Sequence, residues 1–238
     1  SQYASLRYGT ETGFGVQYGI ERRWINARGH KINLDLSYAQ YERSVTALYR
    51  IPAFGWLDGW YGFGFTAREE DFFNAPFNYF EVFGNRSGEY RGWDLSVALK
   101  LRRERFDGTI PDFDPGASVA VYTSTLYPEL KGFWRSSTDN YPAQGSAWRL
   151  MARAGYEFET ANAFFVQGYA MNRRIYSFGS NNRILLRGEL GALATQDYEY
   201  FPTSLRFYAG GADSIRGYAF REIGEYDGTS NLGGKPPA

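Results

Sequence analysis

Long stretches in which apolar and polar residues alternate constrain the fold of this chain more than any other feature. In the clearest stretch, Phe14, Val16, Tyr18, Ile20 and Trp24 share one face, and Gly15, Gln17, Gly19, Glu21 and Arg23 share the other. A period of two residues is that of a β-strand, whose successive side chains point to opposite faces of a sheet. Similar segments recur along the chain, so the sequence predicts eleven strands: 3–11, 14–24, 31–38, 45–51, 59–69, 77–87, 93–102, 119–136, 148–158, 163–177 and 183–196.

Two segments depart from this regularity. Residues 108–116 contain two glycines and two prolines and predict a longer loop. The segment 119–136 is interrupted by Pro128 and Gly132, which weaken its assignment as a strand. Signals for helices are almost absent, and no linker divides the chain.

The length of the strands favours a membrane protein. Most predicted strands run for about 9–14 residues, longer than the 5–6 typical of soluble sheets, and this length suits a tilted crossing of a bilayer. Their polar faces carry charges of both signs, and Tyr and Trp gather toward strand ends, as in interfacial girdles. The sequence therefore predicts an all-β fold, an antiparallel transmembrane β-barrel. The alternative is a soluble β-sandwich or lipocalin-like barrel, in which shorter strands turn their apolar face into a core.

Composition excludes several other classes. Lys+Arg and Asp+Glu balance at 26 each, so no net field favours nucleic acid as a partner. The chain has no cysteine, which removes disulfides, thiolate nucleophiles and Cys-ligated zinc. No run of about 18 apolar residues predicts a transmembrane helix. No signal peptide is visible at Ser1, as in a mature or trimmed chain.

Catalysis and metal binding are not expected. His30 is the sole histidine and lies beside Gly29 in a predicted turn, without Ser and Asp partners that would form a triad. The acidic run at 69–71 could bind a divalent cation, but Asn74 and Pro76 follow it and favour a solvated loop. We therefore expect no enzyme activity, no cofactor and no metal site.

A glycine-rich segment near the end of the chain, 207–218, contains a single arginine, Arg216. Its glycines give the backbone access to positive φ, so that the chain can bend sharply or approach another surface closely. The planar guanidinium of Arg216 could pair bidentately with a carboxylate. A plain alternative is a hairpin turn with one surface arginine.

This segment resembles the signature of a known superfamily. The sequence Leu205-Arg206-Phe207-Tyr208-Ala209-Gly210-Gly211, followed by Ser214-Ile215-Arg216-Gly217-Tyr218, resembles the motif of the BamA/TamA superfamily of outer-membrane assembly factors. Pro202, Asn231-Leu232 and Leu126-Tyr127-Pro128 look most like its TamA branch, the barrel subunit of the translocation and assembly module.

The resemblance implies a domain organisation. Residues 1–238 would be part of an outer-membrane barrel domain, with strands one to eleven in 1–196 and a long extracellular loop in 197–238 that folds back into the barrel. A family barrel has an expected sixteen strands preceded by POTRA domains, so about five strands and the POTRA domains would be absent from this chain. Open sheet edges are untenable in lipid, so these strands would be missing from this sequence, unresolved or supplied by another chain.

The resemblance also implies roles for individual residues. Arg216 would pin the loop by pairing with a carboxylate on the inner barrel wall, one that lies beyond Ala238 in the family. Lumen charges within this chain that could contribute are Glu157, Arg187 and Glu189. The remaining motif residues would bend the loop or pack it against the wall: Gly210, Gly211, Ile215, Gly217, Tyr218, Phe207 and Tyr208.

The first strand is a candidate lateral gate. It is short and weakly apolar through Leu6, Arg7, Tyr8 and Gly9, so it offers few strong cross-strand pairs and its seam would open at low cost. An exposed strand edge is a template for the addition of another strand. The glycine there could instead serve only to ease curvature.

Together these features imply a function. The chain would help to insert or translocate outer-membrane proteins, including autotransporters, by lateral strand pairing at the barrel seam in the bacterial outer membrane. Its partners would be the lipid bilayer, unfolded outer-membrane protein clients and a periplasm-spanning, TamB-like inner-membrane protein, with no nucleic acid. Two alternatives stay open: a two-partner-secretion transporter of the same superfamily, and a passive diffusion porin.

Overall fold

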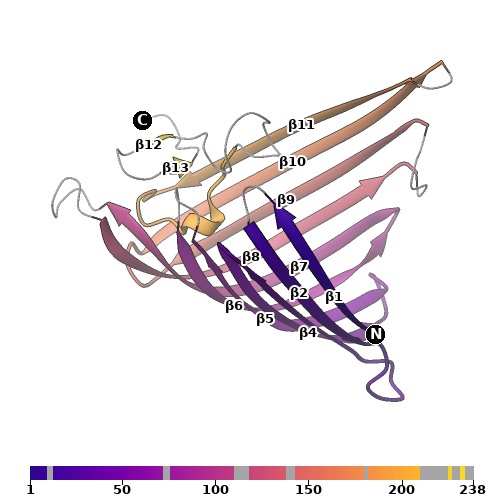
Figure 1. Cartoon of the computed structure of the whole chain (residues 1–238), viewed down its shortest axis with the longest axis horizontal. Helices are drawn as coiled ribbons and strands as arrows, with labels where there is room; N and C mark the ends of the chain where they lie inside the picture. Colours follow the sequence, from indigo (N-terminus) through magenta and orange to yellow (C-terminus); the bar gives the residue numbers. More distant parts are fainter. Residues whose placement is uncertain are drawn as a thin grey trace.

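The computed structural model describes residues 1–9, 13–71, 76–109, 118–137, 143–179, 182–209, 225–226 and 231–233. One antiparallel sheet of eleven strands in sequential order dominates it (Figure 1). These strands are β1 (Gln2–Gly9), β2 (Gly13–Arg22), β3 (Lys31–Ala39), β4 (Glu42–Ala53), β5 (Gly59–Glu70), β6 (Phe77–Tyr90), β7 (Trp93–Thr109), β8 (Ser118–Arg135), β9 (Gly145–Glu157), β10 (Ala163–Phe178) and β11 (Asn182–Thr195). The predicted all-β fold with eleven antiparallel strands is confirmed.

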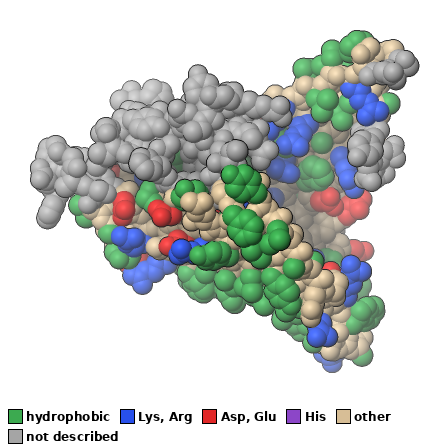
Figure 2. All heavy atoms as spheres, in the orientation of Figure 1, with side chains coloured by type: hydrophobic (Ala, Val, Ile, Leu, Met, Phe, Trp, Pro, Cys, Tyr) green, Lys and Arg blue, Asp and Glu red, His purple; other side chains and the backbone are tan. Residues whose placement is uncertain are grey.

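The two faces of the sheet differ as the alternation predicts. Its outer face exposes large apolar side chains, among them Phe14, Phe63, Leu99 and Val166. Figure 2 shows hydrophobic side chains along the flank of the sheet and charged side chains in the hollow between its walls. An apolar exterior around a polar interior is the pattern of a transmembrane barrel. It is the reverse of a soluble sandwich, in which the apolar face is buried.

Strand β8 runs without a break through the proline that weakened its prediction. Pro128 keeps its place opposite Leu99 of β7, whereas the pairing of β8 with β9 skips Tyr127 and Pro128. Proline has no N–H to donate, so the ladder loses its continuity on one side only. Across this gap, a Cβ at Gly155 of β9 would lie 2.5 Å from the Cβ of Tyr127. Glycine there allows the close approach that buries Tyr127 completely on the inner face.

Strand β7 has 17 residues and is longer than the sequence predicted, whereas β8, with 18 residues, has the length of the predicted strand 119–136. The predicted strand 93–102 continues to Thr109, so residues 108 and 109 of the predicted loop belong to β7; residues 110–117 lie outside the described part. The acidic run at 69–71 was also misassigned. Glu69 and Glu70 end β5, and the buried Glu70 pairs with Arg68 at 2.5 Å rather than facing solvent.

A row of tryptophans marks one rim of the outer face. Trp93, at the start of β7, lies opposite Trp134 of β8, and their rings are 6.3 Å apart. Trp134 in turn lies opposite Trp148 of β9. Tryptophan prefers the interface between the bilayer and water, so this row places that interface at the ends of three neighbouring strands.

The chain after β11 turns back over the inner face. Residues 196–209 include the short 3₁₀ helix η1 (Thr203–Leu205), which lies on the concave side of the sheet (Figure 1). Beyond it, the structure describes β12 (Glu225–Tyr226) and β13 (Asn231–Gly233), which pair with each other. Within the described residues, β1 and β11 each pair on one side only and form the edges of the large sheet. No described helix has the length and apolarity needed to cross a membrane.

Candidate functional site

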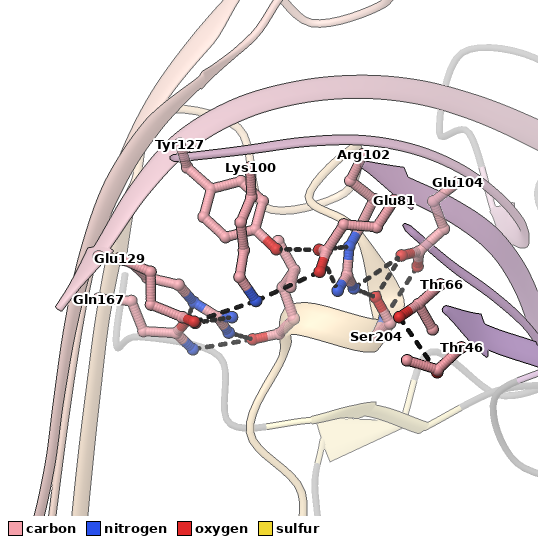
Figure 3. Close-up of polar contacts among 12 residues, drawn as sticks. Thr46, Thr66, Glu81, Lys100, Arg102, Glu104, Tyr127, Glu129, Gln167 and Ser204 are labelled. Atoms are coloured by element: carbon pink, nitrogen blue, oxygen red, sulfur yellow. Dashed lines mark hydrogen bonds and ion pairs between the residues drawn. The ribbon is translucent and has the colours of Figure 1, made fainter. Parts of the chain in front are cut away.

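A buried polar network lies on the inner face of the sheet, and its centre joins three strands. Glu81 of β6 and Arg102 of β7 are directly opposite each other. The Nε of Arg102 donates to Oε2 of Glu81 at 2.8 Å, and its Nη2 forms an ion pair with the same oxygen at 2.6 Å. The hydroxyl of Tyr127 on β8 donates to the same carboxylate at 2.5 Å (Figure 3). The sheet register places these three groups on the same face. Arg102 lies opposite Glu81 on one side and Thr125 on the other, and Tyr127 shares the face of Thr125, two residues before it.

The network continues across β8 and β9 as a chain of alternating charges. Lys100 lies 3.2 Å from Glu81 and 3.0 Å from Glu129, and so bridges the two carboxylates (Figure 3). Glu129 also pairs with Lys131 at 2.8 Å and with Arg153 of β9 at 3.6 Å. Glu81 and Glu129 thus each pair with more than one cation, which compensates for the burial of their charge.

The network holds the segment that follows β11. Glu104 of β7 accepts a hydrogen bond from the backbone N–H of Ser204 at 2.8 Å and another from its hydroxyl group, to which Arg102 also donates. At the next residue, the carbonyl oxygen of Leu205 accepts from Gln167 at 2.8 Å and from Arg153 at 3.0 Å. Side chains of β7, β9 and β10 therefore bind η1 from two sides.

Apolar contacts reinforce this docking. Phe201 and Leu205 of the segment form a buried cluster with Tyr127 and Phe165 of the wall. The rings of Phe165 and Phe201 meet edge to face, with centroids 5.0 Å apart. Such pairs stabilise beyond their buried area by about 0.5–1.5 kcal/mol. The segment is thus part of the packed interior of the sheet.

Arg206 fixes the shape of the docked segment. Its buried guanidinium donates to the backbone carbonyls of Phe201, Tyr198 and Glu199, each at 3.0 Å. It also lies over the ring of Phe106 on β7, 5.4 Å from the centroid. Arginine suits this position because its planar group satisfies several acceptors at once.

Of the predicted motif, the structure describes the first residues only. Phe207 stacks on Tyr169 of β10 with ring centroids 6.1 Å apart and lies over Gly191 of β11. Tyr208 is half-buried. The remaining predicted positions lie outside the described residues: Gly210, Gly211, Ile215, Arg216, Gly217 and Tyr218.

The predicted lumen charges do not join the network. Glu157 ends β9, and its carboxylate accepts from the backbone N–H groups of Glu159, Thr160 and Ala161, so it stabilises the turn to β10. Arg187 and Glu189 of β11 pair with each other on the inner face, where both are partly exposed. Sequence analysis named these residues as further lumen candidates and missed Glu104, because the predicted strand ended at 102. The signal for the network in the sequence was a charged residue at every second position of one strand: Lys100, Arg102 and Glu104.

The proposed gate residues occupy the edge strand. Leu6 and Tyr8 point outward and are 74% and 79% exposed. Arg7 points inward and lies 3.4 Å from Glu42 of β4. Gly9 lies opposite Gly13 at the end of the β1–β2 ladder. Among the described residues, no group of His, Cys, Asp and Glu side chains is arranged to hold a metal ion.

This chain is similar to known proteins in both sequence and fold. A family model described as the Omp85 superfamily domain matches residues 25–236. The structure is similar to the crystal structure of BamA from Haemophilus ducreyi lacking POTRA domains 1-3, with a TM-score of 0.73 and 15% sequence identity. The match covers 94% of this chain and 47% of the BamA chain, so this chain spans about half the length of that structure.

Proposed function

Because this chain belongs to the Omp85 superfamily, we propose that it forms part of the barrel of a bacterial outer-membrane protein that inserts or translocates other polypeptides. The observation that carries the proposal is the segment docked on the inner wall by Glu104, Arg153 and Gln167. A passive porin conducts solutes through an open, water-filled lumen. A segment that packs on the inner wall through buried charges and aromatic rings leaves less open lumen. It therefore favours a protein that inserts or translocates polypeptides over a passive porin.

The second element of the proposal is the edge formed by β1. All eight of its residues pair with β2, and its other side has no partner within the described residues. Backbone groups on a free edge accept a further strand in β-augmentation. A client strand would pair there and move sideways into the bilayer, while the docked segment keeps the inner wall in place.

Within the superfamily we assign the chain to the TamA branch, with autotransporters among its clients and a TamB-like inner-membrane protein as its partner. The Leu126-Tyr127-Pro128 stretch supports this branch, and its central residue occupies the middle of the polar network. The rival is a two-partner-secretion transporter, in which the client would pass along the inner wall rather than the edge.

Photocrosslinking from the outer face tests the edge and separates the rivals. A photoreactive amino acid replaces Leu6 on β1 in the full protein, and the matched control replaces Leu99, which is also outward and exposed but lies in the middle of the sheet. An unfolded outer-membrane client is then added to the reconstituted protein. We expect client adducts at position 6 and not at 99. Adducts only at an inward position such as Tyr169 would favour secretion through the lumen, and none at any position would contradict the proposal.

A further inference from the structure

The outer face carries an apolar groove that the proposed function does not use. It has a volume of about 610 Å³ and extends over β7 to β11. Its floor consists of small residues that the register brings together on three neighbouring strands: Ala152 of β9 lies opposite Gly168 of β10, which lies opposite Ala192 of β11. A cluster of glycine and alanine leaves the surface hollow, because no side chain fills the space above the backbone.

Larger apolar side chains form the walls of this groove. Leu130 stands on the β8 side, Leu150 on β9 and Leu190 on β11, and all three are exposed on the outer face. In a bilayer this surface meets hydrocarbon, so the groove opens toward lipid. An extended polypeptide in the groove would find no partners for its backbone N–H and C=O groups, a cost of several kcal/mol each in lipid. An acyl chain carries no such groups.

The groove also begins beside the tryptophan row. Leu95, Gly132 and Leu150 form the row of residues next to Trp93, Trp134 and Trp148 along the same three strands. Since tryptophan marks the interface, a lipid whose head group lies at that level extends its tail directly into the groove. From this geometry we propose that the groove is a binding site for one acyl chain of a membrane phospholipid.

Filling the groove provides the test. A Cβ at Gly168 would meet no atom within 4 Å, so Gly168→Leu fits the fold while occupying the floor of the groove. Gly188 of β11 is equally open, lies on the same outer face and is not part of the groove lining, which makes Gly188→Leu the matched control. Heat-modifiable migration in electrophoresis confirms that each variant is folded.

The readout is labelling by a phospholipid that carries a diazirine in its acyl chain. The full protein is reconstituted in vesicles of phosphatidylethanolamine and phosphatidylglycerol with a trace of this probe, irradiated and digested with trypsin. We expect the peptide 154–173, which contains Gly168, to be labelled about fivefold more than the peptide 51–68 from the opposite part of the outer face, since packing contacts in lipid are modest. Gly168→Leu should abolish this excess, and Gly188→Leu should retain it.

Three results would overturn the proposal. Equal labelling of the two peptides in the unaltered protein would show lipid contact without a site. An excess that survives Gly168→Leu would place the bound chain elsewhere. The third result is a polypeptide crosslinked to residues 154–173 in protein purified from cells, together with no lipid label on those residues. This result would identify the groove as a protein interface.

Discussion

Glu104 on β7 accepts hydrogen bonds from both the backbone N–H and the hydroxyl group of Ser204, a residue one hundred positions later in the chain. The carboxylate is buried, and Arg102 lies 3.7 Å away as its nearest cation. This carboxylate thus connects the polar network of the wall to the docked segment that contains η1. The stability of this connection can be measured separately from that of the barrel.

Replacement of Glu104 by alanine should release the docked segment. Two hydrogen bonds to a buried carboxylate are lost, and the N–H and hydroxyl groups of Ser204 lose their acceptor, which should cost about 2–4 kcal/mol of local stability. Hydrogen–deuterium exchange of residues 198–206 measures the change. Glu189→Ala, which removes a partly exposed pair on the same inner face, should cost no more than about 1 kcal/mol. Equal protection in the two variants would contradict a special role of Glu104.

Arg206→Lys should weaken the segment although it preserves the charge. The lysine ammonium cannot reach three carbonyl groups in one plane or lie flat over Phe106. We expect a loss of about 1–3 kcal/mol from unsatisfied buried carbonyls. Limited proteolysis within residues 196–209 provides the measurement. Arg174→Lys, at an exposed position that donates to Tyr176, is the control and should cleave like the unaltered protein.

Lys100 and Lys131 should differ in importance although both pair with Glu129. Lys100 bridges two buried carboxylates and is 15% exposed, whereas Lys131 is 55% exposed and contacts Glu129 alone. Lys100→Met should cost about 3–5 kcal/mol, because Glu81 and Glu129 keep their burial and lose their shared cation. Lys131→Met should cost about 0–1 kcal/mol. The denaturation midpoints in lipid decide the order, and a reversed order would refute the bridging role.

Gly155 should not tolerate a side chain. A Cβ there would lie 2.5 Å from the Cβ of Tyr127 and 2.7 Å from the carbonyl oxygen of Leu126, and the backbone cannot shift without disturbing the ladder. Gly155→Ala should therefore destabilise the barrel by about 1–3 kcal/mol through overpacking. Gly188→Ala, in open space, should have little effect. A folding titration of both variants distinguishes them, and similar stabilities would mean that Tyr127 can move away.

The number of strands and the assignment of their faces could be predicted from the sequence because both depend on local information. A side chain at position i and its neighbour at i+2 share a face whatever the rest of the chain does, so the alternation from Phe14 onward identified the lipid-facing side. The continuity of β8 through Pro128 could not be predicted in this way. The continuity depends on which neighbouring strand the backbone nitrogen of Pro128 faces, because this nitrogen has no hydrogen to donate.

The candidate site was decided by tertiary structure. Glu81, Arg102 and Tyr127 meet because three strands pair in one register, and a shift by one residue would send each side chain to the other face. Ser204 reaches Glu104 because the chain turns back after β11, a contact across one hundred residues that no local pattern encodes. Sequence determined which residues could face the interior, because strand periodicity is local; the fold decided which of them meet, because register and chain reversal are not.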